Sequence, residues 1–286
     1  TVNTFDDVID GGDGLLSLRE AIEQAVDGDV IVLQAGTYNL QLTGTDDSNV
    51  GGDFDITGKQ ITIQGAGMND TVIDGNQLDR VFHIRGGSQV TMKDLTVTGG
   101  LLTYGHGGGM HIDGATTVVH LENVKVDGNT VQINNASTST DRVGGGIRVN
   151  NSTVTGVNVQ ITNNLAERVG TGRSTNGAGI YLDGVANVTL TDSVISNNTN
   201  THGTGGGAYV TIGSTLTLEG VTLSGNTVTA GSGGAIFGSY GSTINITNST
   251  TTQTVISGNA ATTGAGVRSD GGSVTITGDT TLGDVR

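Results

Sequence analysis

The sequence of 286 residues has no cysteine, no proline and no tryptophan, and only four phenylalanines and five tyrosines. Without cysteine, disulfides and thiolate metal sites are excluded. Charged residues make up 14% of the chain, and the net charge of −15 leaves too few basic side chains for a nucleic-acid surface. No apolar run approaches the ~18 residues of a membrane span. We therefore expect neither nucleic-acid binding nor membrane insertion.

Glycine is abundant, with 50 residues, and it marks an internal repeat. Six similar units open with three small residues and an apolar one: Gly107–Met110, Gly144–Ile147, Gly177–Ile180, Gly205–Ala208, Gly233–Ile236 and Gly264–Val267. The first five units also contain a pair of small residues that ends in asparagine: Gly128-Asn129, Asn163-Asn164, Asn197-Asn198, Gly225-Asn226 and Gly258-Asn259. Because glycine and asparagine tolerate positive φ, we expect tight corners at these pairs, with side-chain hydrogen bonds between stacked asparagines.

Between the glycines and the asparagines, apolar residues recur with period 2, as in Ile180, Leu182, Val188 and Leu190. Such short strands bury one face only by stacking on copies of themselves. The sequence therefore predicts an all-β fold, a right-handed parallel β-helix with one repeat per coil. We expect a single monomeric domain over residues 1–286, excised from a longer chain. Residues 1–58 would form an N-terminal cap and the first strands, and residues 59–286 the stacked coils.

A short helix is predicted near the N-terminus. Ser17 and Glu20 have the spacing of a capping box. Leu18, Ala21 and Ile22 form one apolar stripe along this helix. We expect the helix to cover the open first coil, whose strand edges would otherwise pair with other chains.

Several segments resemble a known family. Residues 1–4, the acidic stretch 6–13 and the run 17–22 (SLREAI) are similar to the N-terminal "CSLREA" module of large secreted bacterial β-helix proteins, with Leu16 where that module usually has cysteine. The later units, such as Gly233–Ile236, resemble the polymorphic outer-membrane-protein repeat, although isoleucine or leucine stands where its second motif has phenylalanine. The resemblance implies the β-helix fold and a secreted or cell-surface bacterial setting. It supplies no catalytic residue.

Alignment of the coils stacks one outward column of aromatic and cationic residues: His83, His111, Arg148, Tyr181, Tyr209, Phe237 and Arg268. Rings stack on the C–H faces of sugars, so the first six of these residues are candidate contacts for a polysaccharide or cell-surface glycan. We therefore predict a structural or adhesion module that binds polysaccharide. The plainer interpretation is that the column only stabilises neighbouring strands through side-chain pairs.

A second outward column is rich in threonine and includes Thr91, Thr155, Thr189 and Thr217. Such an array suggests ice binding, but His120 interrupts the column and charged residues stand beside it. Because β-branched threonine is favoured on any strand surface, we regard the array as structural.

The alternative function is an enzyme, a polysaccharide lyase or a glycoside hydrolase acting on an acidic polysaccharide. A lyase needs a base and a cation that neutralises the uronate carboxylate, and Arg148, His111 and Tyr181 are the best cluster for that chemistry. The long loops at 129–146 and 164–179 would wall a groove there. No cofactor is required, although Asp6, Asp7, Asp10 and Asp13 supply oxygen ligands of the kind that Ca²⁺ prefers.

Overall fold

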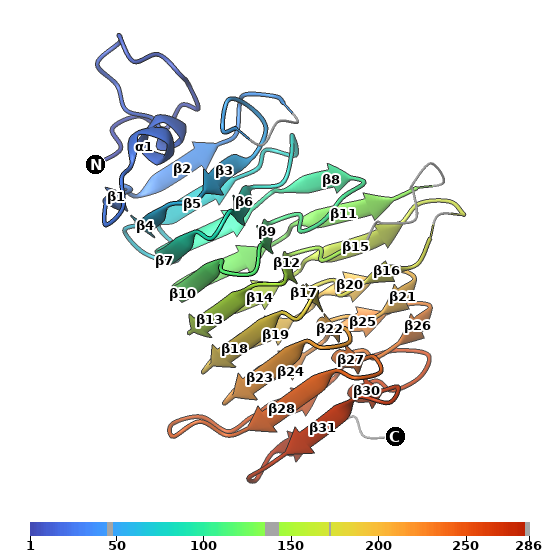
Figure 1. Cartoon of the computed structure of the whole chain (residues 1–286). Helices are drawn as coiled ribbons and strands as arrows, with labels where there is room; N and C mark the ends of the chain where they lie inside the picture. Colours follow the sequence, from blue (N-terminus) through green and yellow to red (C-terminus); the bar gives the residue numbers. More distant parts are fainter. Residues whose placement is uncertain (45–47, 135–142, 172, 284–286) are drawn as a thin grey trace.

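The computed structural model describes residues 1–44, 48–134, 143–171 and 173–283. Parallel strands stack from the N-terminal to the C-terminal end (Figure 1). The coils enclose a main core between three faces and a smaller apolar cluster beside it, and all the strand pairs among the described residues are parallel. The chain is a right-handed parallel β-helix, so the predicted fold class is confirmed.

Face 1 and face 2 belong to one large sheet. Face 1 contains β1 (Val30–Val32), β4 (Gln60–Gln64), β13 (Thr153–Val157), β18 (Asn187–Thr191), β23 (Thr215–Glu219), β28 (Thr243–Thr247) and β31 (Ser273–Ile276). Face 2 contains β2 (Gly36–Asn39), β5 (Thr71–Asp74), β14 (Gln160–Thr162), β19 (Val194–Ser196), β24 (Thr222–Ser224), β29 (Val255–Ser257) and β32 (Thr281–Leu282). The long strands β7 (Gln89–Thr98) and β10 (Val118–Asp127) run through both faces, and they bend at Asp94 and Asn123, which have positive φ.

Face 3 is a separate sheet of eight strands: β3 (Phe54–Thr57), β6 (Phe82–Arg85), β9 (Met110–Asp113), β12 (Ile147–Asn150), β17 (Ile180–Asp183), β22 (Ala208–Val210), β27 (Ile236–Gly238) and β30 (Val267–Ser269). Two small side sheets connect face 2 to face 3. The first contains β8 (Leu101–Thr103), β11 (Thr130–Ile133), β15 (Leu165–Arg168), β20 (Thr199–Asn200) and β25 (Thr227–Val228). The second contains β16 (Thr175–Asn176), β21 (Gly203–Thr204) and β26 (Gly231–Ser232).

The core follows the predicted alternation. Ile180, Leu182, Val188 and Leu190 point inward and are at most 2% exposed, whereas Thr189 between them is half-buried. Each coil places equivalent apolar residues above those of the preceding coil, for example Leu216 beside Val188. Burial of this stacked apolar column is what a single repeat cannot achieve alone.

The two residues of each small-residue pair have different tasks. The first member has positive φ, as in Asn163 (56°) and Asn197 (55°), and makes the corner. The second member is buried and forms an amide ladder, in which Asn164 Nδ2 donates to Asn198 Oδ1 at 2.9 Å and Asn198 Nδ2 donates to Asn226 Oδ1 at 2.9 Å. The predicted sharing of side-chain hydrogen bonds between asparagines is confirmed.

Helix α1 (Leu18–Gln24) has the predicted capping box, because the Ser17 side chain accepts from the Glu20 N–H and the Glu20 side chain accepts from the Ser17 N–H. Leu18 and Ile22 are buried in the core cluster at the N-terminal end of the coils. The structure thus places α1 over the first coil, as expected. No helix among the described residues has the length and apolar character needed to cross a membrane.

Candidate functional site

The outward column on face 3 is formed as the repeat alignment predicts. Strand register places its members next to one another in the order Asp55, His83, His111, Arg148, Tyr181, Tyr209, Phe237 and Arg268. Asp55 was absent from the predicted column because the loop before it does not match the repeat.

Two of the three rings in the aromatic part of this column are buried and Tyr209 between them is half-buried, which corrects the proposed mode of sugar contact. Tyr181 is only 3% exposed and Phe237 only 6%. Tyr209 lies parallel to both rings, with centroid distances of 5.3 Å to Tyr181 and 5.4 Å to Phe237. Arg148 covers the other face of Tyr181, with its guanidinium carbon 6.0 Å from the ring centroid. The ring faces therefore contact one another and arginine, and they are not open to a sugar.

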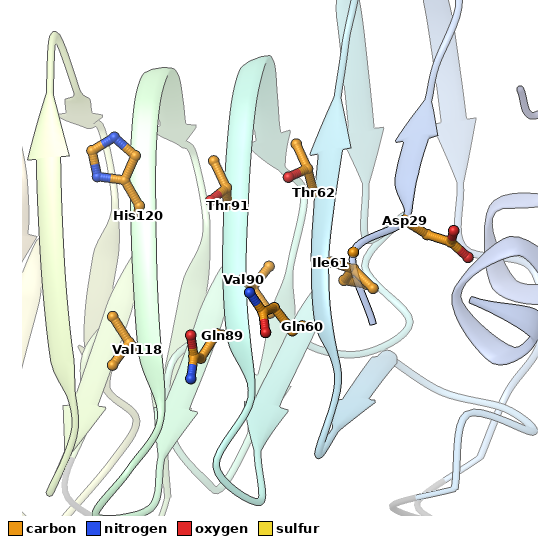
Figure 2. Close-up of a pocket in the computed structure, with 10 residues that line it drawn as sticks. Asp29, Gln60, Ile61, Thr62, Gln89, Val90, Thr91, Val118 and His120 are labelled. Carbon is orange, nitrogen blue, oxygen red and sulfur yellow. The ribbon is translucent and has the colours of Figure 1, made fainter. Parts of the chain in front are cut away.

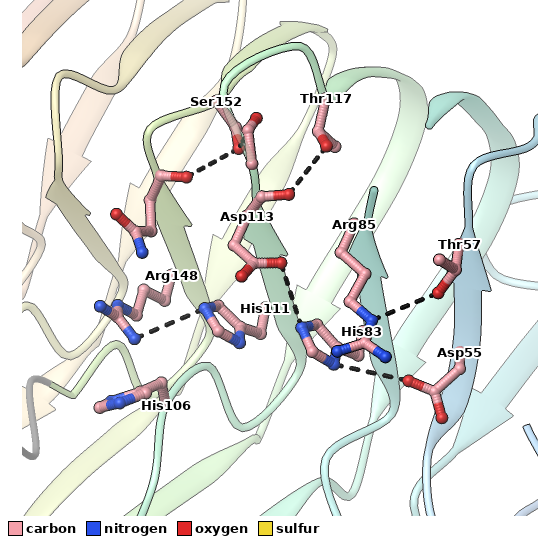
Figure 3. Close-up of polar contacts among 12 residues, drawn as sticks. Asp55, Thr57, His83, Arg85, His106, His111, Asp113, Thr117, Arg148 and Ser152 are labelled. Carbon is pink, nitrogen blue, oxygen red and sulfur yellow. Dashed lines mark hydrogen bonds and ion pairs between the residues drawn. The ribbon is translucent and has the colours of Figure 1, made fainter. Parts of the chain in front are cut away.

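The polar half of the column is centred on His83, which links three successive coils (Figure 3). His83 Nε2 lies 3.2 Å from Asp113 Oδ1, and His83 Nδ1 lies 3.4 Å from Asp55 Oδ1. The ring stacks on His111 at 4.8 Å, with an interplanar angle of 6°. A charged imidazolium can donate to both carboxylates at once, whereas a neutral ring can donate to only one.

Two guanidinium groups flank the second imidazole. Arg148 holds Asp183 with two hydrogen bonds of 3.2 and 2.8 Å, and its Nη1 lies 3.4 Å from His111 Nε2. Arg80 lies on the other side, with its Nη1 3.5 Å from His111 Nδ1 and its Nε 2.5 Å from Asp53 Oδ2. Since arginine only donates and a neutral imidazole has one acceptor nitrogen, the two arginines cannot both bond to His111.

These surroundings shift the pKa values of His83 and His111 in opposite directions. Burial opposes the charged form of His83, but hydrogen bonds to Asp113 and Asp55 outweigh it and raise the pKa of His83 above 6.5. Burial, followed by the positive charge of Arg80, lowers the pKa of His111 well below 6.5. Burial also raises the pKa of Asp53 to about 6, although Arg80 opposes the shift. Perturbed groups of this kind gather at functional sites more often than elsewhere.

We expect the stacked histidines to titrate separately. Near pH 6.5, His83 should be charged and His111 neutral. Long-range ¹H–¹⁵N correlation of the imidazoles between about pH 4 and pH 9 would measure this, with His83→Gln assigning the signals. The contribution of His83 to the free energy of unfolding is fully present at pH values below its unfolded pKa. It is lost as the pH rises through its folded pKa. For His111, which stays neutral in the fold, stability falls as pH decreases below about 6.5. Coincident midpoints for the two rings would contradict the network.

The four aspartates that were predicted as calcium ligands make different contacts in the structure. Asp7 is buried and holds Arg19 with hydrogen bonds of 2.7 and 2.9 Å, so its oxygens already have a cationic partner. Asp10 and Asp13 accept from the N–H groups of Gly12 and Leu15, as turn residues do. Asp6 lies 3.5 Å from Gln41 Nε2. Among the described residues, these four aspartates form no group that could hold a metal.

Two other groups could bring three ligand atoms together, and both include His83. One group adds His111 and Asp113, and the other adds Asp53 and Asp55. Within each group the ligand atoms lie within 4.8 Å of one another. His83 lies between two carboxylates, which raise its pKa, and a metal would compete with the proton for its nitrogens. We therefore interpret both groups as parts of the ion-pair network.

The cluster thus contains residues that the sequence did not indicate, namely Asp53, Asp55 and Arg80. Asp53 and Arg80 precede strands β3 and β6, outside the aligned part of the repeat. Arg80 also donates to the carbonyl oxygen of His106 at 3.0 Å. Of the predicted loop walls, residues 135–142 and residue 172 lie outside the described residues.

Among the comparisons with known proteins, a family model supports the fold. Residues 80–281 match the family model described as "Right handed beta helix region". No curated protein matches the chain. Three solved structures are similar at low identity, and this likeness carries no argument about activity.

The first is pectate lyase Pel9A, with 16% identity over 94% of this chain and 73% of that chain and a TM-score of 0.40. The second is ORF18 of Geobacillus virus E2, with 11% identity over 90% and 56% and a TM-score of 0.38. The third is the A-module of the mannuronan C-5 epimerase AlgE4 from Azotobacter vinelandii, with 14% identity over 96% and 97% and a TM-score of 0.29.

Proposed function

Because this chain belongs to the right-handed β-helix family, whose stacked coils make long regular surfaces, we propose that it binds a polysaccharide along the outside of face 3. The sugar chain would run parallel to the helix axis, across strands β6, β9 and β12. The observation that carries this proposal is a row of half-buried polar side chains, Arg85, Asp113 and Asn150, at the ends of these three strands.

This row has the properties of a surface that binds a linear polymer. Asn150 lies in register with Asp113, so a bound chain meets a new hydrogen-bonding group at every coil, ~4.8 Å apart. The Asp113 carboxylate contacts the His83 imidazole, which is itself buried. This contact keeps the Asp113 side chain in one arrangement. Such preorganisation lowers the entropy lost on binding. Sugar contacts are then hydrogen bonds to the row, in place of the ring stacking first expected.

The proposed setting is outside the cell, secreted or on a bacterial surface. It rests on the resemblance of residues 17–22 and of the glycine-led units to secreted β-helix proteins. An adhesive or structural role fits a rigid rod that exposes one repeated surface, and the monomeric state remains a prediction.

A second candidate function is β-elimination on a uronate-containing polysaccharide, and His111 favours it. A neutral imidazole can take the proton from the carbon next to the carboxylate, and Arg80 or Arg148 can stabilise the negative charge that develops there. The electron pair then forms the carbon–carbon double bond as the glycosidic C–O bond breaks, and the imidazolium can return the proton to the leaving oxygen. Against it, His111 is only 8% exposed, and Arg148 is already bound by Asp183 at two positions. The catalytic roles of Arg148, His111 and Tyr181 stay predictions.

Affinity electrophoresis in gels that contain polygalacturonate, alginate, hyaluronan or xylan tests the proposal. We expect retention by at least one polymer, and a loss of at least fivefold in affinity in Asn150→Ala because a half-buried hydrogen-bonding group is removed. Asn245→Ala on face 1 is the matched control and should bind normally. If no polymer retains the wild-type chain, or if both variants bind normally, the proposed surface is wrong.

The same samples distinguish the second function. Elimination leaves a carbon–carbon double bond conjugated to the carboxylate, so ultraviolet absorbance would rise with time. If it rises, His111→Gln should abolish the increase while unfolding at the same denaturant concentration as the wild type. Retention without any rise in absorbance contradicts the lyase and leaves binding as the function.

A further inference from the structure

A separate pocket of about 340 Å³ lies on face 1 (Figure 2). The short turns 86–88 and 114–117 lie between it and the row on face 3. It spans the turn before β1 and strands β4, β7 and β10 at the N-terminal end of the sheet. Its volume is at the lower end of the range for small-molecule sites. From its geometry and chemistry we propose that this pocket binds a neutral oligosaccharide, independently of the function proposed for face 3.

The pocket is formed by two rows of side chains with different lengths (Figure 2). In one row Gln60 is in register with Gln89, and Gln89 with Val118. In the other row Thr62 is in register with Thr91, and Thr91 with His120. Short threonines beside long glutamines leave a depression in an otherwise flat sheet.

The two ends of the pocket are held in place. At one end the turn that contains Gly28 and Asp29 is fixed by backbone hydrogen bonds, from Gly28 N–H to Gln60 O (2.7 Å) and from Thr62 N–H to Asp29 O (2.9 Å). At the other end His120 Nδ1 lies 2.9 Å from Thr155 Oγ1, which orients the imidazole. A fixed rim loses little entropy when a ligand binds.

The lining selects a ligand that is rich in hydroxyl groups and uncharged. Its amides and hydroxyls each donate and accept, as sugar hydroxyls require. Within the described part of the chain, the side chains of Gln60, Thr62, Gln89 and Thr91 make no hydrogen bond to another residue, so they are available to a ligand.

Charge at the pocket is low. None of the ten residues that line it is lysine or arginine, and Asp29 is the one charged side chain among them. The nearest charges in the next row, Lys93 and Glu122, are paired at 2.6 Å. An anionic sugar would therefore meet no cation here. Val118, 40% exposed, and the His120 ring add an apolar surface for the C–H side of a sugar.

Protein NMR titration with cellotriose, xylotriose and maltotriose tests the proposal. At least one sugar should shift the signals of Thr62, Thr91 and His120 saturably, with a dissociation constant in the millimolar range or tighter. Gln89→Ala should weaken binding by about tenfold, because it removes a donor and an acceptor together. Asn187→Ala is the matched control, since Asn187 is an exposed amide in the same row of face 1, and it should bind like the wild type.

Absence of saturable shifts with all three sugars at about 20 mM would overturn the proposal. So would equal losses in Gln89→Ala and Asn187→Ala, or shifts confined to Arg85, Asp113 and Asn150. The last outcome would instead support binding on face 3, and loss of retention on face 3 would leave the NMR result unaffected. The two proposals can therefore fail separately.

Discussion

Replacement of Arg19 by methionine should lower the free energy of unfolding by about 3–5 kcal/mol, because it leaves a buried carboxylate without its partner. Arg19 is 1% exposed and lies between the N-terminal segment and the first coil. It holds Asp7 with two hydrogen bonds and donates to the carbonyl oxygens of Gly52 (2.7 Å) and Asp53 (3.0 Å). Its guanidinium carbon also lies 4.8 Å from the ring centroid of Phe54.

Chemical denaturation followed by circular dichroism measures this loss. Arg268→Met is the matched control, because Arg268 also pairs with an aspartate (3.2 Å) and lies over a phenylalanine ring (5.9 Å). The Arg268 side chain is 34% exposed, and such surface pairs contribute about 1 kcal/mol or less. Arg19→Lys should lie between wild type and Arg19→Met, since lysine keeps the charge without the planar fork. Similar losses in Arg19→Met and Arg268→Met would contradict a special role for the buried pair.

The stacking of residues along the axis could be predicted from the sequence because two local signals agree. Period-2 alternation determines which side chains face inward, and the glycine and asparagine positions mark the corners of every coil. With these two signals, Tyr181 and Tyr209 had to be neighbours, although they lie in different repeats. The same reasoning placed Asn164 beside Asn198, where the structure has the amide ladder.

Burial of the outward column could not be predicted in this way. Alternation separates inward from outward residues, but it does not report segments that fold back over the outer surface. The glycines that open the six repeat units approach the column closely, and a Cβ atom on Gly205 would lie 2.9 Å from the Tyr209 Cβ. The polar cluster was missed for a related reason, since Asp53 and Arg80 lie in the irregular first coils, where no repeat exists to align them.

The amide ladder gives the second large expected effect. Asn198→Asp should destabilise the fold by about 3–5 kcal/mol, because it introduces an unpaired charge at a site that is 0% exposed. Asn198 Nδ2 donates to Ile161 O and to Asn226 Oδ1, both at 2.9 Å. A carboxylate at this position loses both donors and directs an oxygen at two acceptors. Its own acceptor role toward Asn164 would be retained, so the loss comes from the two missing donors and from the buried charge.

Asn197→Asp is the control for this substitution. Asn197 precedes Asn198 in the chain but is exposed at the corner, with a φ of 55°, so the same change there should cost about 1 kcal/mol or less. Denaturation at neutral pH compares the two variants, and a repeat at about pH 4 should reduce the loss in Asn198→Asp as the buried carboxylate is protonated. Equal losses in the two variants would show that the ladder contributes little to stability. A loss in Asn198→Asp that does not change with pH would contradict the buried charge.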